Sequence, residues 1–120
     1  MFDKNSLALQ RRLAVKDYIF DENNPNFYPN DEYNAFFIRR TQQHFNDLLK
    51  VQGFVFLNDV LRALGIKQRM IGQVAGWKYT EGPGFIEIKI AQRDIRGGKP
   101  FEYFLEIVHD GIIVFDVLGD

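Results

Sequence analysis

The 120-residue sequence contains no cysteine, two histidines and a single serine. Without cysteine the chain can form neither a disulfide nor a thiolate metal site, and it has no cysteine nucleophile. A zinc site would have to rely on His44 and His109, which lie far apart in the sequence, together with carboxylates. We therefore predict no metal, no cofactor and a fold that a hydrophobic core stabilises by itself.

An excess of charge and long apolar runs are also lacking. Fifteen basic residues against sixteen acidic ones give a net charge of −1, so no global field attracts nucleic acid or anionic lipid. No stretch approaches the roughly 20 apolar residues that cross a bilayer, and the first twelve residues carry charges of both signs, unlike a signal peptide. We expect a cytoplasmic protein without a membrane partner.

Aromatic residues are the one class in excess, with twelve Phe, five Tyr and one Trp. Five of them fall within seventeen residues: Phe20, Phe27, Tyr28, Tyr33 and Phe36. Such an excess predicts either a packed aromatic core or an exposed aromatic docking patch.

Helical periodicity dominates the first half of the chain. Ser6 is a candidate N-cap for a helix that carries Leu9, Leu13 and Phe20 on one face. The loop 21–30 contains two prolines and ends this helix.

A second helix is predicted from Asn30 or Asp31 to about Gln52, with Gly53 as its stop. Phe36 falls outside the apolar arc of this helix and is predicted either to contact the first helix or to lie on a binding face. The arc consists of Tyr33, Phe37, Thr41, His44, Phe45, Leu48 and Leu49.

A third, short helix is expected from Asn58, as N-cap, to Leu64, with Gly65 as its end. Residues 66–77 are compatible with a short helix or an ordered loop, because glycine weakens a helix at two positions.

The apolar period then changes from 3.6 to 2. Residues 85–90 alternate as a half-buried strand, residues 97–100 form a turn, and residues 101–108 and 112–117 are predicted as two further strands. Asp110 and Gly111 supply a tight hairpin turn between the last two.

Helices first and strands last predict an α+β fold, with two or three N-terminal helices packed on a three- or four-stranded antiparallel C-terminal sheet. We expect one domain over residues 1–120, with a helical part at 1–76 and a β-meander at 77–118.

Several patterns could support catalysis, and each also has a structural interpretation. Glu87 and Lys89 resemble the E-x-K element of metal-dependent nucleases, yet they also match the solvent face of an alternating strand. Carboxylate pairs could be drawn from Glu102, Glu106, Asp110 and Asp116. A histidine-based triad would need Ser6, Thr41 or Thr80, none of which sits in a nucleophile elbow. A small metal-dependent nuclease or hydrolase is thus a second alternative function, and we favour a protein that is not an enzyme.

Residues 57–79 resemble a helix-turn-helix unit with Gly65 in the turn. Two residues depart from that pattern. Leu61 occupies a position at which the motif has a small residue, and Gly72 weakens the helix that the motif requires there. DNA binding is the first alternative function. Its candidate residues are Arg62, Lys67, Gln68, Arg69, Gln73 and Lys78.

About 35 residues also carry a family resemblance. The run from Leu48 to Val60, then 64–66, then Gly72-Gln73-Val74-x-Gly76-Trp77-x-Tyr79 resembles a block of small uncharacterised proteins from Gram-positive bacteria, their phages and mobile elements. The resemblance implies no activity and assigns no site residue.

The favoured interpretation is a non-catalytic module, a structural or accessory protein of a bacterium or phage, that acts by protein–protein contact or self-association. Its candidate anchors are Phe27, Tyr28 and Phe36. We also predict that Trp77 lies in the core between helices and sheet.

Overall fold

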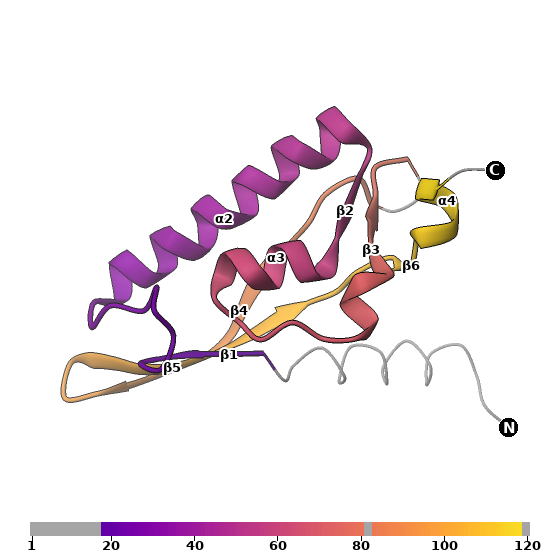
Figure 1. Cartoon of the computed structure of the whole chain (residues 1–120). Helices are drawn as coiled ribbons and strands as arrows, with labels where there is room; N and C mark the ends of the chain where they lie inside the picture. Colours follow the sequence, from indigo (N-terminus) through magenta and orange to yellow (C-terminus); the bar gives the residue numbers. More distant parts are fainter. Residues whose placement is uncertain (1–17, 81–82, 119–120) are drawn as a thin grey trace, which may run out of the picture.

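The computed structural model describes residues 18–80 and 83–118 (Figure 1). Helices and strands alternate along the chain instead of separating into two halves. In chain order they are β1 (Tyr18–Asp21), α2 (Asp31–Gln52), β2 (Phe54–Phe56), α3 (Leu57–Leu64), a 3-10 turn (Ile71–Gln73), β3 (Ala75–Lys78), β4 (Ile88–Arg96), β5 (Lys99–Ile107), β6 (Gly111–Ile112) and α4 (Val114–Leu118).

The strands form two antiparallel sheets of three strands, in the orders β1-β5-β4 and β2-β3-β6. Both α2 and α3 lie on one side of the long β4–β5 hairpin (Figure 1). The α+β class and the antiparallel pairing are therefore confirmed. The prediction of a single C-terminal sheet is wrong, because β1 and β2 come from the first half of the chain and pair with strands of the second half.

Helix α2 begins and ends where its sequence predicts. The Asn30 side chain accepts a hydrogen bond from the Tyr33 amide at 3.0 Å, and Gly53 closes the helix at φ 88°. Its buried face is rotated from the predicted arc, since Asn34 and Ile38 are buried whereas Tyr33 and His44 are exposed.

The rotation has a polar cause. A periodicity argument treats Asn34 as a surface residue, but the structure satisfies its buried amide group with hydrogen bonds to the Tyr28 backbone and the Tyr103 hydroxyl. The predicted arc is confirmed at Thr41, Phe45 and Leu49.

The core lies between the helices and the inner face of β1-β5-β4. Phe20 is its aromatic centre, with ring centroids 5.7 Å from Phe27, 5.8 Å from Phe37 and 6.0 Å from Tyr103. Trp77 is 1% exposed, so its predicted core position is confirmed. Much of the aromatic excess therefore serves packing.

The first predicted helix is wrong at its C-terminal end; its residues before Tyr18 lie outside the described part of the chain. Tyr18 to Asp21 form β1, in which Tyr18 and Phe20 are buried and Ile19 is exposed. This alternation is too short to outweigh helical spacing in the sequence, and the pairing partner, β5, lies more than 80 residues away.

The hairpin between β4 and β5 is confirmed, with its turn at Gly97 and Gly98. The predicted strand 112–117 is wrong, since β6 ends at Ile112 and α4 follows. The hairpin predicted at Asp110 and Gly111 is also wrong, because β6 pairs with β3.

Two hydrogen bonds explain this turn onto β3. The Asp110 amide donates to the Gly76 carbonyl at 2.8 Å, and the Asp110 carboxylate accepts from the Lys78 amide at 3.0 Å. These hydrogen bonds attach the segment that follows β5 to strand β3.

Helix α3 ends at Gly65 as predicted, at φ 78°, but Asn58 is not its N-cap. The helix begins at Leu57, and the Asn58 side chain reaches across to the next loop. Its oxygen accepts from the Arg69 amide at 2.9 Å, and its nitrogen donates to the Arg69 carbonyl at 2.8 Å. Residues 66–77 accordingly form an ordered loop, a 3-10 turn and the start of β3.

Replacing Asn58 with alanine should lower the free energy of unfolding by about 2 kcal/mol, because both backbone groups of Arg69 lose a partly buried partner. Urea unfolding measures the change. The control is Gln68→Ala at an exposed position of the same loop, which should stay within about 0.5 kcal/mol. Equal effects of the two changes would contradict this role of Asn58.

Candidate functional site

Some of the acidic residues considered for catalysis lie close together, and others do not. Glu87, Glu106 and Asp110 line a pocket of about 250 Å³ together with Lys89 and Trp77. Glu102 lies farther along β5, opposite Asp94. The side chain of Asp116 lies outside the described set. Within the described residues, no three histidine or carboxylate side chains come close enough to hold a metal ion.

The histidines lie on separate elements. His44 is exposed on α2, with its ring 4.9 Å from Phe45, and His109 accepts a hydrogen bond from the Gly111 amide at 3.0 Å. Thr41 donates its hydroxyl to the Phe37 carbonyl, which leaves that proton engaged within the helix. Thr80 is exposed, and Ser6 lies outside the described residues. Within the described residues, the Thr41 hydroxyl therefore donates to the helix backbone and not to a histidine.

The helix-turn-helix geometry is wrong, because α3 is followed by a loop, a 3-10 turn and a strand. Gly72 and Gly76 explain this outcome: a β-carbon at either position would overlap Asn58 or the β2 backbone, so both glycines serve close packing.

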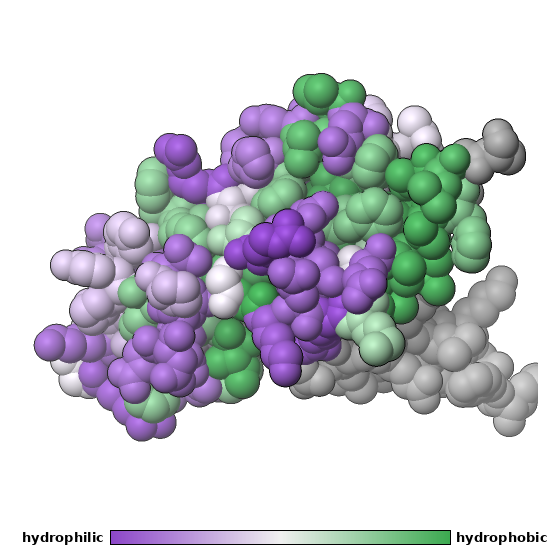
Figure 2. Space-filling model, in the orientation of Figure 1, coloured by the Kyte–Doolittle hydropathy of each residue, from purple (hydrophilic) through white to green (hydrophobic). Residues whose placement is uncertain are grey.

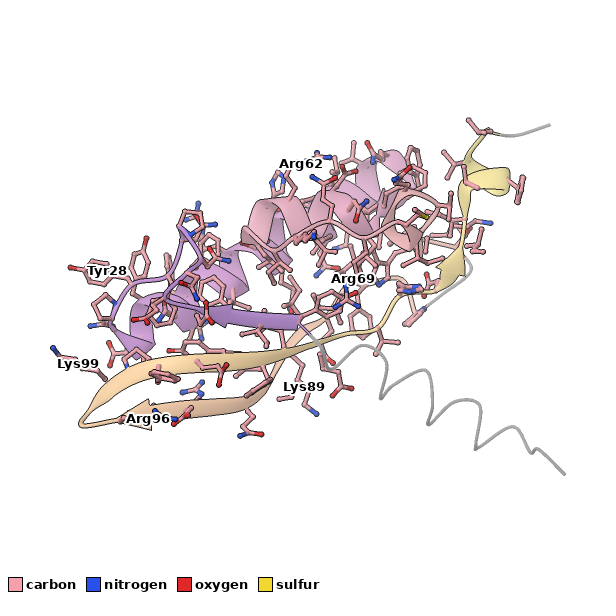
Figure 3. All side chains as sticks on the ribbon, turned by 60° about the horizontal axis from the view of Figure 1, so that its bottom comes forward. Tyr28, Arg62, Arg69, Lys89, Arg96 and Lys99 are labelled. Carbon is pink, nitrogen blue, oxygen red and sulfur yellow. The ribbon has the colours of Figure 1, made fainter. Side chains whose placement is uncertain are left out.

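The proposed DNA-contacting residues consequently share no helix. Arg62 pairs with Asp59 at 3.2 Å on α3, whereas the Arg69 guanidinium lies 4.2 Å from the centre of the Tyr18 ring on β1 (Figure 3). Lys78 lies on β3. Lys67, Gln68 and Gln73 are exposed in the connecting segment.

Exposed aromatic side chains gather at the N-terminal end of α2. Tyr28, Tyr33 and Phe36 are 57%, 49% and 52% exposed, and the Tyr28 and Tyr33 ring centroids lie 5.2 Å apart. Phe27, the third predicted anchor, instead packs against the core. We call the surrounding hollow, of about 710 Å³, the aromatic groove. It is lined by Tyr28, Asn30, Asp31, Glu32, Tyr33, Ala35, Phe36, Arg39 and Arg93.

A buried asparagine fixes the backbone beneath this groove. The Asn34 side chain accepts from the Tyr28 amide at 2.9 Å and donates to the Tyr28 carbonyl at 2.6 Å. The same nitrogen lies 3.2 Å from the Tyr103 hydroxyl, to which it also donates. The loop that carries Tyr28 is therefore tied to both α2 and β5, which orders it before any ligand binds.

A second set of contacts joins the groove to the sheet. The Tyr103 hydroxyl donates to one oxygen of Asp31 at 2.7 Å, and Arg93 donates to the other at 2.6 Å. The Asp31 carboxylate thus connects α2 with both β4 and β5. Sequence reasoning missed Asn34, Asp31 and Arg93 as parts of the site, because the contacts that join α2 to Tyr103 and Arg93 link elements distant in the sequence.

Burial raises the pKa of Tyr103 to about 12, and the neighbouring Asp31 carboxylate adds to the rise while the Asn34 amide opposes it. Because the unfolded tyrosine ionises near pH 10, the folded state holds the proton more tightly between about pH 10 and 12. The stabilisation from Tyr103 is complete below pH 10 and declines above it.

The free energy of unfolding of Tyr103→Phe should therefore fall less steeply between pH 10 and 12 than that of the unchanged protein. Chemical denaturation at several pH values measures the two slopes. The control is Tyr79→Phe, an exposed tyrosine for which the steeper slope should persist. Identical slopes for all three proteins would contradict the assignment.

A second group of exposed apolar side chains lies near the C-terminal end of the described chain. Figure 2 shows this region as a hydrophobic surface around α4. Its most exposed members are Met70, Ile112, Phe115 and Leu118. Hydrogen bonds from the Ile113 and Val114 amides to the Val74 carbonyl hold the start of α4 against the segment that follows Met70.

These features define a class: a small α+β protein with exposed aromatic side chains around a groove at the N-terminal end of α2. No helix among the described residues is long and apolar enough to cross a membrane. The chain belongs to the Family of unknown function (DUF6353), whose model matches residues 3–108. No curated protein and no solved structure matches the chain.

Proposed function

We propose that this protein is a non-catalytic binding module that contacts another protein, or a second copy of itself, through the aromatic groove. The carrying observation is that three large aromatic side chains stay half exposed, and that the buried Asn34 side chain hydrogen-bonds both backbone groups of Tyr28. Aromatic anchors at interfaces supply much of the binding energy, and prior ordering lowers the entropy that binding costs.

The exposure of these rings contrasts with the rest of the aromatic set. The neighbouring rings of Phe20, Phe27 and Phe37 pack in or against the core. A core that can bury aromatic rings therefore lies close to the exposed ones. Tyr28 and Tyr33 instead pack on one another at the surface. Contact with another protein would bury the faces of these rings that the fold leaves exposed.

The biological setting is also part of the proposal. We propose an accessory or structural role in a bacterium or phage, the setting of the small proteins that residues 48–60, 64–66 and 72–79 resemble. DNA binding through Arg62, Lys67 and Arg69 is disfavoured, because no recognition helix carries these residues and the net charge is −1.

The test compares two triple variants of matched character. Tyr28→Ser/Tyr33→Ser/Phe36→Ser removes the groove aromatics, and Met70→Ser/Phe115→Ser/Leu118→Ser removes three strongly exposed apolar side chains of the surface around α4. Both should keep the melting temperature within a few degrees, because the removed side chains lie at the surface.

Only the first variant should lose the interaction. Light scattering measures self-association, and cross-linking in the source cell measures binding of a partner protein. Retention of both by the first variant would refute the groove as the interaction surface. Loss in the second variant alone would assign the function to the surface around α4.

A further inference from the structure

We infer that residues 1–17 of this chain dock in a second groove, on the face of the β1-β5-β4 sheet that points away from α2 and α3. This groove shares no lining residue with the aromatic groove, so the inference does not depend on the proposed function. It is carried by the lining of that face, by the point at which residues 1–17 join the described chain, and by charge complementarity.

The outer face of the sheet is hollowed. Leu105 and Ile107 are buried on the side of the helices, so Glu106 and Val108 alternate to the other side. Two hollows of about 250 and 370 Å³ adjoin on this outer side, because both are lined by Lys89 and Glu106 (Figure 3). We call the two together the sheet groove. Phe104 lies at one end of it, Lys89 and Glu106 in the middle, and Val108 and Asp110 at the other end.

The sheet groove exposes apolar surface that the core does not cover. Phe85 and Val108 line it and are 51% and 47% exposed. Phe104 lines its other end and pairs with Ile19 of β1, which is 44% exposed. A sheet face that only water covers is typically polar. These side chains therefore favour a protein segment as the cover of this face.

Residues 1–17 join the described chain beside the sheet groove. Tyr18 begins β1 and pairs with Leu105 of β5. Because the two strands are antiparallel, the end of β1 to which residues 1–17 attach points toward the C-terminal end of β5. The twelve residues of the helix predicted from Ser6 would rise about 18 Å. The five steps from Leu105 to Asp110 span about 17 Å when extended. The segment is thus long enough to follow the groove to its end.

The charges of the segment and the groove are complementary. Residues 1–17 carry two acidic side chains and four basic ones, namely Lys4, Arg11, Arg12 and Lys16. Among the described residues, the sheet groove carries the carboxylates of Glu87, Glu106 and Asp110 and the ammonium group of Lys89. Docking therefore brings an excess of positive charge to an excess of negative charge.

The predicted helix presents apolar and basic contacts side by side. At 100° per residue, Leu13 lies about 40° from Leu9 around the helix axis. Lys16 lies about 20° and Arg12 about 60° from Leu9 in the opposite sense. The two leucines can therefore contact the apolar wall of the groove while the two flanking cations reach its carboxylates.

The surface around α4 is a less suitable site for this segment. Its most exposed members are all apolar, so the basic residues of the segment would gain no ion pair from them. The family match over residues 3–108 also includes most of the segment and the groove as far as Val108, but it does not include α4. The segment and the sheet groove thus belong to the same unit of the family.

The first experiment uses a spin label. Because the chain contains no cysteine, Gln10→Cys gives a single attachment site for a nitroxide. In the isotopically labelled full chain, amide signals should broaden most at residues 89–92 and 104–110 and little at residues 28–36 of the aromatic groove. Equal broadening of both regions, or broadening of neither, would overturn the docking.

Two controls define the contact. Leu9→Ser/Leu13→Ser should abolish the selective broadening, whereas Leu7→Ser/Val15→Ser, which changes apolar residues off that stripe, should retain it. Retention by the first variant would overturn the apolar contact. A mixture of spin-labelled chain without isotopes and isotopically labelled chain without the spin label should show no broadening. Broadening in the mixture would assign the segment to a second copy and overturn the intramolecular contact.

Trypsin tests the charged contact, because its cleavage sites in the segment are the basic residues themselves. Glu87→Gln/Glu106→Gln should speed cleavage within residues 1–17 about fivefold, as expected for the loss of two partly exposed ion pairs. The control Glu22→Gln/Glu32→Gln removes two exposed carboxylates outside the groove and should leave the rate unchanged. Thermal melting verifies that all variants are folded. Equal rates for the two double variants would overturn the charged contact.

Discussion

Trp77→Ala is expected to lower the free energy of unfolding by about 3–5 kcal/mol, a large part of the total for a domain of this size. The indole is 1% exposed, and its Nε1–H donates to the Val108 carbonyl at 3.0 Å. Alanine would leave a cavity in the core and an unpaired carbonyl where β5 leads into the segment that precedes β6. Because Trp77 belongs to β3, the central strand of the second sheet, the loss affects both of its neighbours.

Two further variants separate the causes of this effect. Trp77→Phe keeps most of the packing and loses the hydrogen bond, so it should cost less than alanine but remain clearly destabilising. Phe115→Ala removes an aromatic ring that is 80% exposed and should stay within about 0.5 kcal/mol. Urea unfolding of all three measures the differences. An unchanged midpoint for Trp77→Ala would refute the core role of the indole.

Gly76→Ala should be nearly as damaging, with an expected loss of about 3 kcal/mol. A β-carbon at this position would overlap the Val55 carbonyl oxygen and lie 2.8 Å from the Phe56 α-carbon. These are backbone atoms of β2, so no flexible side chain can move aside. The strand pairing of β2 with β3 would have to open to admit one methyl group.

The control for this prediction is a glycine with open surroundings. Gly97 occupies the β4–β5 turn at φ 59°, and nothing lies within 4 Å of a β-carbon there. Gly97→Asn should cost about 1 kcal/mol or less, because asparagine tolerates this conformation. Thermal and urea unfolding compare the two proteins. Equal losses would show that the close approach of β2 to Gly76 does not matter for stability.

Local signals in the sequence located several helix ends and one hairpin turn correctly. Asn30 and Gly53 bound α2, Gly65 ends α3, and the pair at 97–98 turns β4 into β5. Each of these residues acts on backbone groups within a few positions, so its effect is readable without knowledge of the fold. The alternation around Ile86 and Ile88 is local in the same sense.

The predicted anchors divide for a different reason. Tyr28 and Phe36 are exposed as the functional interpretation requires, whereas Phe27 completes the aromatic cluster around Phe20. Adjacent positions in a loop point in different directions, and the sequence contains no periodicity there that tells one direction from another. The position of β1 settles which ring turns inward.

By itself the sequence determined that the chain forms no disulfide, that it contains the long helix α2 and that β4 and β5 are joined by a tight turn. Only the tertiary structure decided that Tyr18–Asp21 pairs with β5, that β6 joins β3, and that Asn34, Asp31 and Arg93 support one groove. The physical reason is the range of the forces involved. Caps and turns satisfy neighbouring backbone groups, whereas the pairing of β1 with β5 and of β6 with β3, and the contacts of Tyr103 and Arg93 with α2, depend on partners far along the chain that only the folded structure brings together.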